Sequence, residues 1–317
     1  MDNNLPNTQL DDQKMENLRK RTKLSKYIMI AGGVCLGIVV LMILLNGGTL
    51  SLNFKTPTGV VAIILIIGGF ALLFAGIAFK QKAGEAQKHI ANNYAQSVLG
   101  RVMDRLDTFD HGKHIDRYYL NQDFGFPKYD CTGFCGDYVR GVLRGVPMEF
   151  CEFELQEKHV TEDKDGDTDV SYETVFYGVI VVCRHNLALS DAVMATQFKT
   201  YENAYNADSE AFYNAFSVRC TSEQDAELAL TPDYMQKLLE LSAERGKRFA
   251  IRFLQDGTLL LVIKDMNLFE MGKSENTVQL VEKLEKEMED FINILDTLAL
   301  PAQKVTDHPN AERSELR

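Results

Sequence analysis

Residues 27–46, YIMIAGGVCLGIVVLMILLN, form a twenty-residue run without a charged side chain, and residues 60–79, VVAIILIIGGFALLFAGIAF, repeat that length and character. As helices, each run would extend roughly 30 Å at about 1.5 Å per residue, which matches the hydrocarbon core of a bilayer. A buried helix of a soluble protein seldom stays apolar on every face over this length. The two runs therefore predict a transmembrane helical hairpin over residues 27–79.

The flanks of the two runs predict the orientation of this hairpin. Lysine and arginine favour the cytoplasmic side of a membrane, and the connecting loop carries only Lys55. Both ends should therefore be cytoplasmic, with residues 1–26 as a polar, basic N-terminus. Because a polar segment precedes the first run and a second run follows it, a cleaved signal peptide is not expected. The basic residues outside the runs are Arg19, Lys20, Arg21, Lys23, Lys26, Lys80, Lys82 and Lys88.

Small residues recur at four-residue spacing in both runs. Gly33 and Gly37 form a GxxxG motif, and Ala71 and Ala75 a similar pair. Such pairs let membrane helices approach closely, so we interpret them as the contact between the two helices, although glycine and alanine are also common in membrane helices generally. Neither run contains an ionisable residue, which argues against transport by the hairpin alone.

Residues 80–110 keep apolar side chains three or four positions apart, as in an amphipathic helix. We predict a helical stalk that continues from the second run and packs on the following domain or on a second copy. The apolar stripe consists of Ile90, Tyr94, Val98, Val102, Leu106 and Phe109.

Residues 111–300 mix strand and helix patterns and predict an α+β domain in which helices pack on a meander-rich antiparallel sheet. Residues 151–156 alternate apolar and polar side chains, as in a half-buried strand. Residues 174–183 are more continuously apolar, which suggests burial on both faces. Residues 216–220 read as another short strand, and residues 276–298 carry an apolar helical stripe.

Turn and capping residues place two further elements of this domain. Thr231 and Pro232 open a helix that Gly246 ends. Asp256 and Gly257 join two β-rich runs as a hairpin. The remaining residues, 301–317, are polar and are expected to form a disordered tail.

Composition excludes some classes of protein. The formal net charge of -11 argues against nucleic-acid binding, which needs a basic surface. The six cysteines are dispersed along 317 residues, unlike the dense pattern of a secreted disulfide scaffold.

Several runs in order resemble DUF3137, a family of uncharacterised bacterial membrane proteins sometimes labelled galanin-like. The matching runs are DYVRGVLRGVPMEFCEFEL, ETVFYGVIVV, FYNAFSVRCTSEQDAELALTPDYMQKLLEL and FAIRFLQDGTLLLVIKDMNLFE. The resemblance covers residues 85–300 and implies a multi-pass protein of the bacterial inner (cytoplasmic) membrane. It implies no activity and no site residues. A weaker implication is a protein partner of the LemA type.

The most conspicuous polar motif is TEDKDGDTDV at residues 161–170, where aspartates alternate at 163, 165, 167 and 169. An EF-hand calcium loop needs glycine at its sixth position, an acidic ligand at its twelfth and flanking helices. Counted from Asp163, those two positions are Thr168 and Thr174, and the flanks read as strands. We therefore interpret this segment as a solvated hairpin loop, with calcium or adventitious cation binding as the alternatives.

Two other groups contain residue types that bind metals. Cys131 and Cys135 have CxxxC spacing, but no second Cys/His pair follows at the usual interval for zinc. Asp110, His111 and His114 would share a face only if Gly112 lay within a helix, and we interpret them as a loop.

No catalytic signature stands out. Gly141 and Gly145 lie in β-like sequence, so Gly145 is expected in a tight hairpin rather than a phosphate loop. Arg184 and His185 follow a strand, where a lone histidine is usually exposed or hydrogen-bonded locally.

We therefore expect no catalytic, cofactor-binding or metal-binding residues and no cofactor. The sequence predicts a membrane-anchored, non-enzymatic scaffold or regulatory protein that binds the lipid bilayer and a protein partner or a second copy. The alternatives are a lipid or small-ligand sensor and a hydrolase with an unrecognised site.

Overall fold

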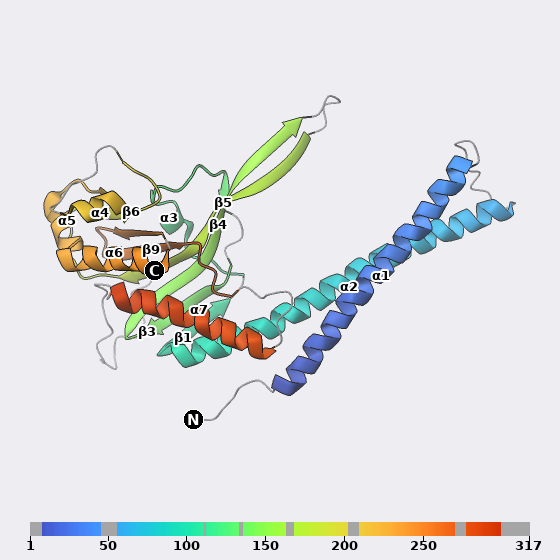
Figure 1. Cartoon of the computed structure of the whole chain (residues 1–317), viewed down its shortest axis with the longest axis horizontal. Helices are drawn as coiled ribbons and strands as arrows, with labels where there is room; N and C mark the ends of the chain where they lie inside the picture. Colours follow the sequence, from blue (N-terminus) through green and yellow to red (C-terminus); the bar gives the residue numbers. More distant parts are fainter. Residues whose placement is uncertain are drawn as a thin grey trace. The chain divides into compact units, whose positions relative to one another are not determined.

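The computed structural model describes residues 8–45, 56–110, 112–132, 136–162, 168–201, 209–246, 248–269 and 277–298. The chain divides into two compact units (Figure 1). The first contains residues 1–97 and 271–282, and the second contains residues 98–270 and 283–317. The predicted tail, residues 301–317, and residues 46–55 between the two apolar runs lie outside the described residues.

Two long helices make up most of the first unit. Helix α1 spans Thr8–Leu45, and α2 spans Pro57–Val102, with its last residues in the second unit. Both are long and apolar enough to cross a membrane. Each contains one of the apolar runs, so the predicted pair of helices is confirmed.

The contact between α1 and α2 uses different glycines from those predicted. A Cβ atom on Gly32 would lie 2.8 Å from the carbonyl oxygen of Gly69, and one on Gly76 would lie 2.5 Å from Cγ of Met29. By contrast, Cβ atoms on Gly33 and Gly37 would meet no described atom within 4 Å. The predicted GxxxG contact is therefore wrong. Adjacent helical residues point about 100° apart, so Gly33 lies beside the contact rather than in it.

The predicted helical stalk over residues 80–110 is correct only as far as Val102. Strand β1, Arg105–Asp110, follows and pairs with β3, Tyr138–Leu143. The register shifts between Leu106 and Thr108, which adds one residue to β1. This bulge puts Leu106 and Phe109 on the same face of the strand, opposite Gly141 and Val139. Their three-residue spacing therefore imitates a helix.

The second unit is built around one antiparallel sheet, which confirms the α+β class. In the described residues its strand order is β1-β3-β4-β5-β9-β8-β6-β7, with β2 paired to β4. The bounds of the strands not yet given are Cys131–Thr132 (β2), Val146–Glu162 (β4), Thr168–Arg184 (β5), Val193–Thr196 (β6), Ser217–Arg219 (β7), Phe249–Phe253 (β8) and Thr258–Lys264 (β9).

The turns of this sheet follow the predicted residues. Arg144 and Gly145 have φ of 52° and 75°, as in the two-residue turn that matches strand twist, and they join β3 to β4. Gly257 has φ of 83° and its N–H donates to the carbonyl of Leu254, which closes the turn from β8 to β9. Both predicted hairpins are confirmed.

The helices of the second unit are α3 (Arg117–Leu120), α4 (Glu210–Ala215), α5 (Glu223–Ala229), α6 (Pro232–Arg245) and most of α7 (Thr277–Leu298). The predicted caps of α6 are present, because Thr231 accepts a hydrogen bond from the Tyr234 N–H and Gly246 adopts φ of 59°. The predicted C-terminal helix corresponds to α7.

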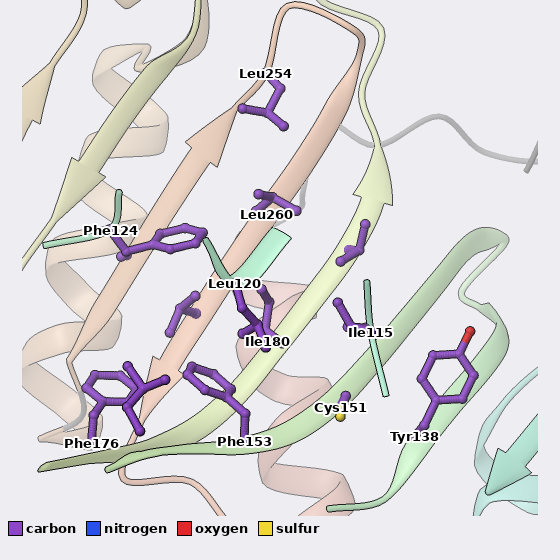
Figure 2. Packing of buried hydrophobic residues seen from close by; sticks show 14 residues of the cluster. Ile115, Leu120, Phe124, Tyr138, Cys151, Phe153, Phe176, Ile180, Leu254 and Leu260 are labelled. Carbon is purple, nitrogen blue, oxygen red and sulfur yellow. The ribbon is translucent and has the colours of Figure 1, made fainter. Parts of the chain in front are cut away.

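Both faces of the sheet are covered. On one face, the chain around α3 contributes Ile115, Leu120 and Phe124 to a buried cluster with Phe153 and Phe176 of β4 and β5 (Figure 2). The opposite face packs against helices, since the rings of Phe150 and Phe291 lie 4.8 Å apart and those of Tyr234 and Phe253 lie 6.1 Å apart. This explains why residues 178–183 are buried continuously, as the apolar pattern predicted.

Candidate functional site

The apolar side chains of α1 and α2 are mostly exposed in the first unit. Phe74 is 69% exposed, and Ile30 and Leu41 are similarly open. The most apolar stretches of the two helices are only 11% and 17% buried. A core helix of a soluble protein would bury such side chains, whereas a bilayer would cover them without any protein contact. The outer surface of this hairpin is therefore a candidate membrane surface.

A second exposed feature is the outer part of the β4–β5 hairpin, residues 157–162 and 168–173, which we call the ribbon. Figure 1 shows it extending beyond the other strands of the sheet. In the described residues, these two segments pair only with each other. The register shifts where Leu155 faces Phe176 and Gln156 faces Thr174, so Val175 is an extra residue. Bulges increase local twist and bend a strand, which explains why the ribbon leaves the sheet at this point.

One face of the ribbon carries three exposed apolar side chains beside Lys158 and Glu162, and the other carries a pair of glutamates. Val160 faces Val170, and Tyr172 lies two residues further along on the same side. These side chains are 56%, 42% and 54% exposed, respectively. On the other side, Glu157 faces Glu173, a like-charge pair that destabilises a sheet. One face of the ribbon therefore exposes apolar side chains to solvent. The other presents two carboxylates, of which that of Glu173 lies 3.2 Å from the Nε2 atom of His159.

The conspicuous acidic segment lies at the tip of this ribbon. Its residues 163–167 are outside the described residues, whereas Asp169 is exposed and faces Thr161 in the ladder. The flanking elements are strands, as predicted, but they extend to Glu162 and from Thr168. The strand ends inferred near Gln156 and Thr174 are therefore wrong. Because the ribbon is exposed on both faces, polar residues lie on both, and they obscure the alternation of apolar and polar side chains that predicts a strand.

The other candidate metal ligands do not gather in the described residues. Cys131 is in β2, with its thiol 3.8 Å from the Gln156 carbonyl, and Cys135 lies outside the described residues, as does His111. The Nδ1 atom of His114 is 2.9 Å from the Ile115 carbonyl, and Asp110 accepts from the Gly112 N–H. No group of three or more potential ligands occurs in the part of the chain that is described.

His185 is a buried structural residue rather than an exposed one. Its Nε2 lies 3.0 Å from the Leu254 carbonyl, and its Nδ1 accepts from the Leu187 N–H at 3.2 Å. These contacts define the neutral ring with the proton on Nε2. Burial lowers the pKa of His185 below its ordinary value. The local hydrogen bonding expected for this residue is confirmed, and it ties the end of β5 to the β8–β9 turn. The neighbouring Arg184 is exposed.

The predicted glycines also have structural roles. A Cβ atom on Gly141 would collide with the carbonyl oxygen of Arg105, so this glycine lets β1 approach β3 closely. Gly145 donates its N–H to the Asp104 carboxylate at 2.7 Å.

Sequence reasoning missed a polar cluster around Asp123. Its carboxylate accepts from Tyr201 Oη at 2.9 Å and pairs with Arg219 at 2.5 Å, while Arg252 donates to its backbone carbonyl at 3.0 Å. Burial favours a higher pKa for Asp123, but the hydrogen bonds from Tyr201 and Gly125 and the charge of Arg219 outweigh it and lower the pKa. Burial and the same carboxylate raise the pKa of Tyr201 to about 12. The cluster fastens the chain after α3 to strands β7 and β8.

Asp225 forms a second such cluster. Its carboxylate accepts from the Ser190 hydroxyl at 2.5 Å and from the N–H groups of Ser190 and Asp191. These bonds, led by that of the Ser190 side chain, lower the pKa of Asp225. The carboxylate fixes the loop before β6 to α5. Both clusters bring together side chains that are far apart in the sequence, so no local sequence motif predicts them.

Comparison with known proteins supports the resemblance noted from the sequence. Residues 170–300 match the model of a family described as "Protein of unknown function (DUF3137)". This match begins within β5 and extends past α7, so it includes most of β5, strands β6 to β9 and helices α4 to α7, but not strands β1 to β4 or the two long helices. No curated protein and no solved structure matches the chain.

Proposed function

We propose that this protein is a non-enzymatic membrane-anchored scaffold or regulatory protein, held in the bacterial inner membrane by α1 and α2 with both ends in the cytoplasm. The observation that carries the anchor is the exposure of apolar side chains along both helices. The basic residues that flank the two runs, compared with the single lysine between them, support the orientation.

The anchor is tested by treating membranes that contain the full-length protein with alkaline carbonate. Peripheral proteins are released, whereas a protein with two spanning helices stays in the pellet. Recovery in the supernatant would contradict the anchor.

We propose further that the ribbon is the partner-binding surface of the second unit. Its exposed Val160, Val170 and Tyr172 support a protein partner that offers apolar side chains. The facing Glu157 and Glu173, of which Glu173 also contacts His159, support basic side chains on that partner. The acidic side chains at positions 163, 165, 167 and 169 add to the negative charge of the tip. Complementary charge raises association rates and selects partners.

Site-specific photo-crosslinking in native membranes tests this surface. A photoreactive amino acid at Tyr172 should give a discrete protein adduct. Tyr118 of α3 is an equally exposed control, since both tyrosines are 54% exposed. Replacing Glu157 and Glu173 with glutamine should weaken the Tyr172 adduct. Absence of an adduct at Tyr172, or equal adducts at both positions, would contradict the assignment.

A further inference from the structure

A groove lies between α1 and α2 within the first unit, beside the basic ends of the apolar runs. Its volume is about 540 Å³, which is in the usual range for small-molecule sites. Each helix contributes residues at positions i, i+3, i+4 and i+7, so one face of each helix lines it. Leu18, Ala86 and Ile90 provide the apolar part of this lining.

The polar part of the groove is positively charged. Lys14, Arg21 and His89 line it together with two asparagines, and none of its lining residues is acidic. The nearby Glu16 does not line the groove and pairs with Lys20 at 2.8 Å. In the described part of the chain, Arg21 and His89 have no hydrogen-bond or ion-pair partner. A chain with a net charge of -11 thus places two cations and an imidazole around one acid-free cavity.

The position of the groove relative to the proposed membrane limits which classes of ligand can reach it. Arg21 precedes the first apolar run, which begins at Tyr27, by six residues, or about 9 Å of helix. The headgroup layer is roughly 5–8 Å thick on each side of the hydrocarbon core. The membrane-facing end of the groove is therefore within reach of headgroup phosphates, while Lys14 lies two turns further into the aqueous phase.

We propose that this groove binds a phosphate ester, either the headgroup of an anionic phospholipid or a soluble organophosphate. Arg21 and His89 donate hydrogen bonds to the phosphate, and Leu18 and Ile90 contact the apolar part of the ligand. The lipid source depends on the proposed membrane anchor, whereas the soluble source does not. Guanidinium groups suit this role because they pair with phosphate oxygens through two parallel hydrogen bonds.

The test compares two variants of equal charge. Arg21→Gln removes one of the two cations that line the groove, and Arg19→Gln removes a cation two residues away that does not line it. In one arm, the full-length protein is reconstituted in nanodiscs of equal parts phosphatidylcholine and phosphatidylglycerol, and native mass spectrometry counts retained phosphatidylglycerol. In the other arm, glycerol 3-phosphate is titrated calorimetrically into the protein in nanodiscs of phosphatidylcholine alone and in micelles.

Binding in either arm that falls about tenfold or more in Arg21→Gln, but not in Arg19→Gln, supports the proposal and identifies the source. Absence of binding in both arms, or equal loss in both variants, overturns it. Insertion is read separately, from elution of the protein with the nanodisc. Failed insertion would count against the anchor, while the titration in micelles still decides whether the groove binds phosphate.

Discussion

Alanine substitution at two adjacent glycines of α1 should have different effects on the stability of the helical hairpin. At Gly32 the new methyl group would lie 2.8 Å from the Gly69 carbonyl oxygen and 3.0 Å from Cγ of Leu73, so the helices must move apart. At Gly33 it would meet no described atom within 4 Å. Overpacking of this kind costs roughly 1–3 kcal/mol, whereas the gain in helix propensity from glycine to alanine is about 1 kcal/mol at either site.

The difference in hairpin stability between the two variants measures the steric contact alone, because the gain in helix propensity is the same at both positions and cancels. Gly33→Ala should leave the hairpin unchanged or stabilise it slightly, and Gly32→Ala should be less stable than Gly33→Ala by about 1–3 kcal/mol. Steric trapping measures this in micelles, with bulky tags on the exposed Leu44 and Val61 that compete with association of α1 and α2. Equal stabilities for the two variants, or a larger loss at Gly33, would refute the assigned contact.

Three further predictions concern the second unit; because the chain has no tryptophan, two of them are followed by circular dichroism of the full-length protein in micelles. Burial lowers the pKa of His185, so the contribution of its neutral ring to stability is complete above pH 6.5 and is lost as the pH falls through that value towards the lowered pKa. His185→Gln should therefore flatten this part of the profile of melting temperature against pH. An unchanged slope would show that other groups cause the pH dependence. Gly178→Ala would push a methyl group into the Ile263 carbonyl oxygen between β5 and β9, which should destabilise the fold by about 1–3 kcal/mol. The loss is measured as faster labelling of the buried Cys183 thiol on heating. Gly100→Ala, whose new methyl group meets no described atom within 4 Å, is the control, and equal labelling of the two variants would contradict the close approach of the strands. Asp123 has a lowered pKa, so the contribution of its carboxylate to stability exists above pH 3.8 and is lost as the pH falls below that value. Asp123→Asn should therefore lower the melting temperature at pH 7 by an amount worth less than about 1 kcal/mol, and the melting temperatures of variant and parent should converge in acid. A difference in melting temperature that stays constant with pH would show that the charge is not the cause.

Local patterns in the sequence predicted those features that depend on local chemistry. The caps of α6 and the turns at Gly145 and Gly257 follow from residues a few positions apart. The apolar runs predicted α1 and α2 because the pattern persists over many turns. These inferences needed no knowledge of which segments meet in space.

The errors arose where a distant segment decides the local structure. Leu106 and Phe109 have helical spacing, yet pairing with β3 makes them part of a bulged strand. Choosing Gly32 over Gly33 as the contact glycine requires the rotation of α1 against α2, which a GxxxG motif does not specify. The cluster around Asp123 and the groove between α1 and α2 likewise combine residues far apart in the sequence. None of these follows from a local period.

Cysteine accessibility on the two sides of the membrane tests the central claim most directly. In a cysteine-free background, Thr56→Cys marks the start of α2 and Asp169→Cys marks the ribbon. A membrane-impermeant maleimide added to intact spheroplasts should label the cysteine at position 56, and should label the one at position 169 only after lysis. Equal labelling of both before lysis, or of neither until lysis, would contradict a hairpin that spans the membrane with its large domain inside.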